Sequence, residues 1–162
     1  MQLPQKYHSY SDAKKKIEHY CAYRERCHKE VVEKLRSMGI YQEERDRILG
    51  HLIEENYLNE TRFAQAFARG KFRIKKWGRK RIIGELQQRN ISHYNLKKGL
   101  AEIEESEYLE TLTVLAEKFW DSNAQHATVI RKKKVINALY YRGWETDLIY
   151  DQIRDLENRK DS

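Results

Sequence analysis

Residues 82–91 read IIGELQQRNI, and the same pattern occurs as VVEKLRSMGI at 31–40 and as VINALYYRGW at 135–144. Each stretch opens with two apolar residues, has leucine at its fifth position, and ends with glycine or asparagine followed by a large apolar residue. Two more apolar columns follow in each copy, Leu49, Leu100 and Ile153, and then Leu52, Ile103 and Leu156. The copies are offset by 51 and 53 residues, which is close to the period of helical repeats.

The glycine or asparagine in each copy predicts a helix end, because these residues tolerate the left-handed backbone that closes many helices. The pattern therefore predicts three tandem units, each of three helices with a tight turn before the third. The only proline is Pro4, and 35% of the residues are charged, which favours helix over sheet. We expect an all-α fold, an elongated array of three stacked, helix-turn-helix-like repeats, because a unit of about 50 residues has little core of its own.

The repeat register sets the predicted boundaries. First helices are expected at about 12–24, 60–76 and 107–121, second helices at 28–38, 79–89 and 128–142, and third helices at 42–56, 93–105 and 146–158. Ser92 and Thr146 are the expected N-caps of two third helices. The chain then divides into a flexible N-terminal tail (1–11), repeat 1 (12–58), repeat 2 (59–106), repeat 3 (107–158) and a C-terminal tail (159–162).

Positive charge is concentrated in repeat 2. Residues 69–81 contain eight Lys or Arg and no acid, and residues 69–98 contain eleven bases against the single acid Glu85. Of the chain's 32 bases and 25 acids, 21 and 24 lie outside that segment, so the net charge of +7 is local. A local surplus is what a polyanion-binding surface needs, because each cation that meets a phosphate releases a condensed counterion.

One apolar stripe on the helix expected at 60–76 has the spacing of a buried face, and it comprises Phe63, Ala66, Phe67, Gly70, Ile74 and Trp77. Basic residues run one position ahead of the stripe, about 100° around the helix, so core and charge are separated. Gly78 is expected to end this helix. Trp77 has two interpretations: a core residue, which we favour, or a ring on which a nucleic-acid base stacks.

The candidate contacts to a polyanion or an acidic protein are the bases of this region and of a second, shorter cluster in repeat 3: Arg62, Arg69, Lys71, Arg73, Lys75, Lys76, Arg79, Lys80, Arg81, Arg131, Lys132, Lys133 and Lys134. Tyr140 and Tyr141 follow the second cluster. A solvated helix face is the alternative for any charge run, but eight bases without an acid favour a contact. The cations at 79–81 also oppose the dipole of the helix that they open, which a negatively charged partner would explain.

No catalytic, cofactor or metal site is expected. Cys21 and Cys27 lack a second ligand pair and a secretory context, so they are interpreted as reduced, buried thiols. Phosphate-binding glycine loops, nucleophile elbows and zinc motifs are missing from the sequence. The acidic clusters at 43–55 and 102–110 are interpreted as solvated faces. The chain has no apolar stretch of the roughly 18 residues that span a bilayer and no signal peptide at its start, so we expect a cytoplasmic, soluble non-enzyme without a membrane partner.

Several short motifs, in this order, resemble the RecX family of bacterial modulators of the RecA recombinase: Tyr57-Leu58, Arg62-Phe63-Ala64, Gly78, Arg81-Ile82, Glu85-Leu86 and Ile91. The resemblance extends from about Tyr20 to Leu156, and the chain departs from the family pattern at Asn59, Glu60 and Asn90 and at Cys27-His28. The resemblance implies an all-helical protein without catalytic residues that lodges in the groove of the RecA filament on single-stranded DNA. It also implies that the protein hinders ATP hydrolysis and strand exchange and favours filament disassembly. We expect weaker binding to duplex DNA and a monomeric free protein.

Two alternatives of other classes remain open. A stand-alone DNA-binding protein of helix-turn-helix type would read bases with a third helix, although the third helices here are acidic or mixed. A helical scaffold for an unrelated acidic protein would show no dependence on nucleic acid. It is also open whether the basic surface meets DNA phosphates, acidic RecA residues or both.

Overall fold

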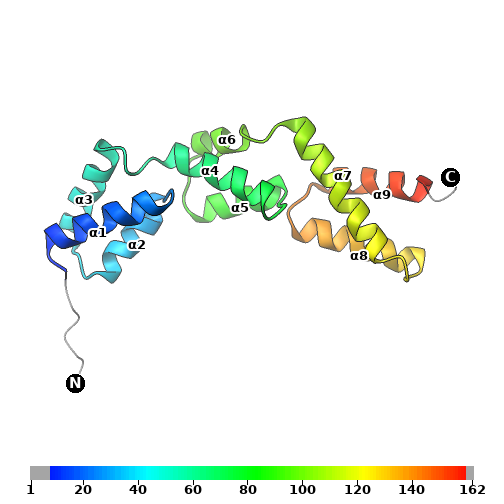
Figure 1. Ribbon diagram of the computed structural model, residues 1–162, viewed down its shortest axis with the longest axis horizontal. Coiled ribbons are helices and arrows are strands. Elements are labelled where there is room, and N and C mark those ends of the chain that lie inside the picture. The colour runs from blue at the N-terminus through cyan, green and yellow to red at the C-terminus, as the bar shows by residue number, and fades with distance from the viewer. Residues whose placement is uncertain (1–7, 160–162) are drawn as a thin grey trace, which may run out of the picture. The chain divides into compact units, whose positions relative to one another are not determined.

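A computed structural model describes residues 8–159, and these residues form nine α-helices and no strand (Figure 1). The helices are α1 (Tyr10–Tyr23), α2 (His28–Ser37), α3 (Gln42–Glu54), α4 (Glu60–Arg73), α5 (Arg79–Gln88), α6 (His93–Leu100), α7 (Glu105–Ser122), α8 (Thr128–Tyr141) and α9 (Thr146–Asn158). The prediction of an all-α fold built from repeated three-helix units is confirmed. The predicted tails lie largely outside the described residues, and the elongated shape stays a prediction.

The same turn closes the second helix of each repeat. Gly39, Asn90 and Gly143 have φ values of 77°, 58° and 90°, which is the left-handed region that the sequence predicted. After each of them, the N–H of the next residue donates to the carbonyl of the leucine five positions earlier: Ile40 to Leu35 (3.2 Å), Ile91 to Leu86 (3.1 Å) and Trp144 to Leu139 (3.2 Å). This is the Schellman arrangement. All six of these apolar side chains are buried, so the turn positions each leucine and its successor in a core.

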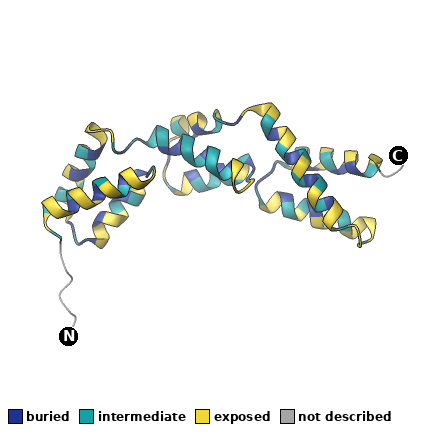
Figure 2. Cartoon of the chain, in the orientation of Figure 1, coloured by how far each residue is buried: buried dark blue, intermediate teal, exposed yellow. Residues whose placement is uncertain are grey.

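By their contacts, the described residues divide into two compact units. One comprises the described residues up to Ala66 together with Leu86–Gly99, and the other comprises Phe67–Glu85 together with the described residues from Leu100 onward. In the first unit, α1, α2 and α3 pack on one another around Ile17, Leu35 and Ile48, which have no exposed surface. In Figure 2 the buried positions recur along one side of these helices.

The second unit has an aromatic core where α7, α8 and α9 pack together. The Tyr108 ring lies 4.4 Å from that of Trp144 and 5.8 Å from that of Phe72, between ring centroids. All three side chains are almost completely buried. Phe72 comes from the last turn of α4. It therefore anchors residues 69–81, which hold eight of the thirteen predicted contact residues, to this core.

Two predicted helix ends are wrong by three residues or more, because buried residues outside the helices redirect the chain. The third helix of repeat 2 stops at Leu100 instead of 105, since the chain turns there to bury Ile103, and α7 already begins at Glu105. Helix α4 ends at Arg73, and Lys76, with φ 59°, closes it instead of Gly78. The N–H of Trp77 then donates to the carbonyl of Lys71 (3.1 Å).

The expected buried stripe of α4 is also only partly correct. Phe63 is buried, but Ile74 is 78% exposed because it lies beyond the helix end, and the remaining four residues of the stripe are half-buried. The buried positions are instead Ala64, Ala68 and Phe72. Helix α6 approaches this face closely at Ala64: a Cβ on Gly99 would lie 2.7 Å from the carbonyl oxygen of Ala64 and 3.2 Å from its Cβ, so position 99 has to be glycine.

One of the two expected N-caps is correct. The Asn95 N–H donates to Ser92 Oγ (3.1 Å) at the start of α6, as expected. Thr146 is the first helical residue of α9, and Glu145 occupies the cap position before it. The carboxylate of Glu145 makes no cap bond and pairs instead with the Arg79 guanidinium.

Candidate nucleic-acid interface

Acidic side chains within the chain pair with many of the predicted contact residues. In the second unit, Arg69 Nη1 lies 2.6 Å from Glu102 Oε1, and Arg73 Nε lies 3.5 Å from Glu107 Oε1. In the first unit, Arg62 Nε lies 2.5 Å from Glu25 Oε1. The acidic cluster at 102–110 is therefore not simply the solvated face that the sequence analysis expected. The positive charge of these arginines is therefore partly balanced within each unit.

Arg79 has the most complete set of internal partners. Its guanidinium pairs with Glu105 and with Glu145 (2.9 Å), and it lies 3.8 Å from the centre of the Tyr108 ring. Its backbone N–H donates to the Tyr108 hydroxyl (2.9 Å), and that hydroxyl donates to Glu145. Burial, followed by the hydrogen bond to Glu145, raises the pKa of Tyr108 above its usual range. The two carboxylates offset the unfavourable placement of this cation at the start of α5, so an external partner is not needed to explain it.

Backbone contacts join the start of α5 to the end of α8. The Gly78 N–H donates to the carbonyl of Arg142 (2.8 Å), and the Lys80 N–H donates to that of Gly143 (3.0 Å). Trp144 Nε1 adds a bond to the carbonyl of Lys76 (3.1 Å). A Cβ on Gly78 would lie 2.4 Å from the Gly143 oxygen, so only glycine allows this approach. The junction brings the basic segment of repeat 2 next to the aromatic end of α8.

A cluster of alternating cations and rings results, and we call Phe67, Lys71, Trp77, Arg81 and Tyr141 the cation-aromatic cluster. Lys71 Nζ lies 5.5 Å and 4.9 Å from the ring centres of Phe67 and Trp77. The Arg81 guanidinium carbon lies 4.2 Å and 5.0 Å from those of Trp77 and Tyr141. Trp77 is half-buried, between the two interpretations that the sequence left open, whereas Tyr141 is 73% exposed.

Three exposed lysines lie between the cluster residues Lys71 and Arg81 in the sequence. Lys75, Lys76 and Lys80 are exposed, and none of them forms an ion pair with another described residue. Lys76 is held by the left-handed turn that closes α4, so its place is set by the backbone. With Lys71 and Arg81, which lie against rings and not against carboxylates of the described residues, these three ammonium groups make up the uncompensated charge of the segment.

The second basic cluster, on α8, also contains both bases with partners inside the chain and exposed bases. Arg131 lies over the Trp120 ring (4.0 Å) and donates through Nε to the Trp120 carbonyl (2.9 Å), and Lys132 pairs with Glu157. Lys133 and Lys134 are exposed. Twelve of the thirteen predicted contact residues thus belong to the second unit, and Arg62 belongs to the first.

This arrangement suits a single-stranded nucleic acid. Ammonium groups attract phosphates without demanding one geometry, and exposed rings offer a surface to unpaired bases. Sequence reasoning identified the bases and named Tyr141, but it missed Tyr108 and Glu145, which position the segment. In the sequence, Glu145 is recognisable only as a residue next to the repeat-3 turn, and Tyr108 only as an aromatic residue of the repeat-3 core. Neither feature distinguishes them from residues with a purely structural role.

Other kinds of site find little support among the described residues. Cys21 and Cys27 are buried free thiols, and burial raises the pKa of each to about 11, which makes them poor nucleophiles. Across residues 8–159, no three His, Cys, Asp or Glu side chains come together as a possible metal site. In the same range, every helix is too short or too polar to cross a membrane.

Known proteins match the chain over most of its length. Residues 59–100 match the family model described as RecX, second three-helix domain, and residues 105–153 match the RecX third three-helix domain. Regulatory protein RecX of Lactobacillus johnsonii is 28% identical over 145 residues, and that of Bacillus cytotoxicus is 24% identical over 142 residues. Each alignment covers 88% of this chain and 53% of the relative, so the chain spans about half the length of these curated relatives.

Solved structures show the same fold. The crystal structure of RecX from Lactobacillus salivarius matches with a TM-score of 0.79 at 24% identity, covering 91% of this chain and 96% of that one. A second crystal structure, of a regulatory protein RecX, matches with a TM-score of 0.77 at 21% identity, covering 90% and 74%. Together the two domain models match more than half of the residues. The chain belongs to the RecX family of regulatory proteins.

Proposed function

We propose that this protein binds the RecA filament on single-stranded DNA and hinders its ATP hydrolysis and strand exchange. Membership of the RecX family supports the choice of partner. The observation that carries the proposal is the cation-aromatic cluster with its exposed lysines, because these cations are not paired with carboxylates of the described residues and two of them, Lys71 and Arg81, lie against aromatic rings. We assign Lys71, Lys75, Lys76, Lys80 and Arg81 to the contact, and Arg69, Arg73 and Arg79, which pair with carboxylates, to holding the segment in place.

A regulator of this kind needs no catalytic group. A protein that binds one state of a filament better than another shifts the filament toward that state, by as much as the two affinities differ. Cations that reach DNA phosphates inside the filament would make this binding fall with salt. Rings that accept an unpaired base would favour single strands over duplex.

The test is ATP hydrolysis by the cognate RecA on single-stranded DNA, with and without this protein. Inhibition well below one molecule per RecA protomer supports a filament modulator, whereas inhibition only at coverage of the bare DNA supports a simple competitor. No inhibition, together with binding that prefers duplex DNA, would instead favour the helix-turn-helix alternative. Binding to an acidic protein without any dependence on nucleic acid would favour the scaffold alternative.

A charge variant assigns the surface. Changing Lys75, Lys76 and Lys80 to Gln should flatten the salt slope of single-stranded DNA binding by about 2, because each phosphate that is no longer neutralised reduces the slope by roughly 0.7. The matched control changes Lys15, Lys97 and Lys118 to Gln; these are exposed helical lysines elsewhere in the chain. Gln has nearly the helix propensity of Lys, so both triple variants should fold. If the two variants inhibit RecA equally well, the lysines near the cluster are a solvated face.

A further inference from the structure

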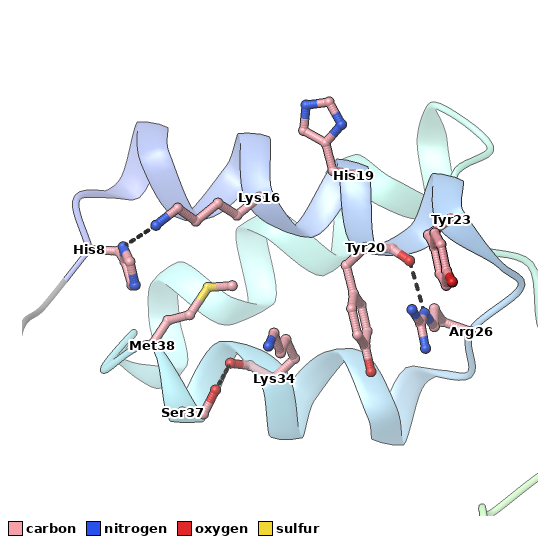
Figure 3. A pocket seen from close by; sticks show the side chains of 9 residues that line it. All are labelled: His8, Lys16, His19, Tyr20, Tyr23, Arg26, Lys34, Ser37 and Met38. Carbon is pink, nitrogen blue, oxygen red and sulfur yellow. Dashed lines mark hydrogen bonds between the residues drawn. The ribbon is translucent and has the colours of Figure 1, made fainter.

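A cationic groove lies between α1 and α2, in the part of the chain that neither domain model matches. Its volume is about 510 Å³. In Figure 3 the side chains of Tyr20, Arg26 and Lys34 lie between the two helices, whereas His19 projects from the other side of α1. All of its lining residues belong to the first unit. The groove is therefore separate from the cation-aromatic cluster in sequence and in fold.

The charge of the groove has one sign. Lys16, Arg26 and Lys34 line it, and none of its nine lining residues is acidic. The carboxylate of Glu30 lies 3.9 Å from the Arg26 guanidinium, and it also pairs with Arg24 (3.0 Å) and accepts from the backbone N–H of residue 27. Its negative charge is thus shared among several donors, and the groove keeps an excess of positive charge.

Arg26 is the only charged residue that is buried among those described, with 7% of its surface exposed. Its guanidinium carbon lies 3.6 Å from the centre of the Tyr20 ring, and its Nε donates to the Tyr20 carbonyl (2.8 Å). These contacts fix the guanidinium plane, and the carboxylate that pairs with it, Glu30, stands 3.9 Å away. Because a buried cation is unfavourable unless it is well partnered, a guanidinium held in this way at the wall of a groove suits an anion that completes its set of partners.

Two lysines and an aromatic ring extend the groove. Lys16 Nζ lies 3.0 Å from His8 Nδ1, and Lys34 Nζ lies 5.7 Å from the Tyr20 ring centre. Tyr23, at the end of α1, is 84% exposed although it is a large aromatic residue. A cationic groove together with an uncovered aromatic ring is the combination by which single-stranded nucleic acids are bound without sequence preference.

We propose that this groove binds the phosphate backbone of single-stranded DNA, with Tyr23 providing the surface on which a neighbouring base stacks. The inference deepens the proposed function and rests on it for the choice of DNA, but it gives repeat 1 a contact of its own. An acidic protein segment would use the same cations but would gain nothing from Tyr23. A free nucleotide would use one phosphate and would show no dependence on strand length.

The test changes Lys16 and Lys34 to Gln in the full chain and measures binding of oligo-dT against salt. Both lysines are exposed, so the fold should persist, which a urea melt checks. Removing two cations that each neutralise a phosphate should flatten the slope by about 1.4, which is a loss of about 25-fold at 0.1 M salt if the affinities converge at 1 M. The control changes Lys15 and Lys118 to Gln, removes the same charge outside the groove, and should leave the slope almost unchanged. Equal slopes for the two double variants would overturn the inference.

Tyr23→Ala separates the base from the phosphate. Affinity for oligo-dT should fall about tenfold, whereas affinity for an abasic oligonucleotide of the same length should not change. An equal loss for both oligonucleotides, or binding of poly-glutamate that depends on Lys16 and Lys34 as strongly as oligo-dT does, would overturn the assignment to DNA. So would binding of dTMP as tight as that of a longer oligonucleotide.

The two proposals fail in different ways. If the Lys75, Lys76 and Lys80 variant loses DNA binding while the Lys16 and Lys34 variant keeps it, the groove is not a DNA site and the proposed function stands. If only the groove variant loses binding, the inference stands and the role given to the cation-aromatic cluster is wrong.

Discussion

Replacing Gly78 by alanine tests the junction between α5 and α8. The added Cβ would lie 2.4 Å from the carbonyl oxygen of Gly143 and 2.6 Å from Trp144 Cα. An ordinary contact needs 3.4 Å or more, so the two backbones must separate by about 1 Å. Overpacking of this kind costs about 1 to 3 kcal/mol. The separation also weakens two hydrogen bonds, from the Gly78 and Lys80 N–H groups, at about 1 kcal/mol each. We therefore expect the free energy of unfolding to fall by about 3 to 5 kcal/mol.

Tryptophan fluorescence during urea unfolding is a suitable measurement, because Trp77, Trp120 and Trp144 all belong to the second unit. Gly84→Ala is the matched control. Gly84 lies inside α5 with nothing within 4 Å of an added Cβ, so alanine there should stabilise by about 0.5 to 1 kcal/mol. If Gly78→Ala unfolds within about 0.5 kcal/mol of the unchanged protein while the control behaves as expected, the close approach does not exist and the junction argument is wrong.

Three further predictions concern the cores. Leu86→Ala, and the same change at its repeat equivalents Leu35 and Leu139, should each destabilise by about 2 to 5 kcal/mol in denaturant melts followed by circular dichroism; less than about 0.5 kcal/mol at all three would refute the repeat register. Tyr108→Phe should cost about 1 to 3 kcal/mol, because Glu145 loses its hydroxyl donor; no change would show that this hydroxyl is dispensable. The buried thiols of Cys21 and Cys27 keep their protons to about pH 11, against an ordinary pKa of 9.0. Since the unfolded thiols ionise first, stability should be lost between pH 9 and 11, by up to about 2.7 kcal/mol for each; a Cys21→Ala variant with the same pH dependence would contradict this.

The repeat could be predicted from sequence because its decisive turn is local. A left-handed residue must stand four positions after a buried leucine, and only a few residue types tolerate that backbone, so Gly39, Asn90 and Gly143 mark the register. The buried face of α4 was harder to predict. Its close contact with α6 involves the small residue Ala64, whereas the prediction followed the larger apolar side chains.

The basic segment was identified from composition, but the separate roles of its members could not be. Arg69 meets Glu102 across 33 residues of sequence, and Arg79 meets Glu145 across 66. No helical period relates positions so far apart. The sequence alone therefore could not distinguish the basic residues that pair with an acid from those that do not. The same holds for Arg26, whose groove forms only when α1 and α2 pack together.

In this chain, guanidinium groups mostly face carboxylates and ammonium groups mostly face solvent. Reagents and enzymes that acylate amines do not act on guanidinium groups. Acetylation of Lys75, Lys76 and Lys80 would thus remove positive charge from the outer surface, whereas the pairs of Arg69, Arg73 and Arg79 would stay intact. Lysine acetylation would therefore lower the affinity of this segment for a polyanion without changing the fold. A surface built from arginine alone would not respond to acetylation.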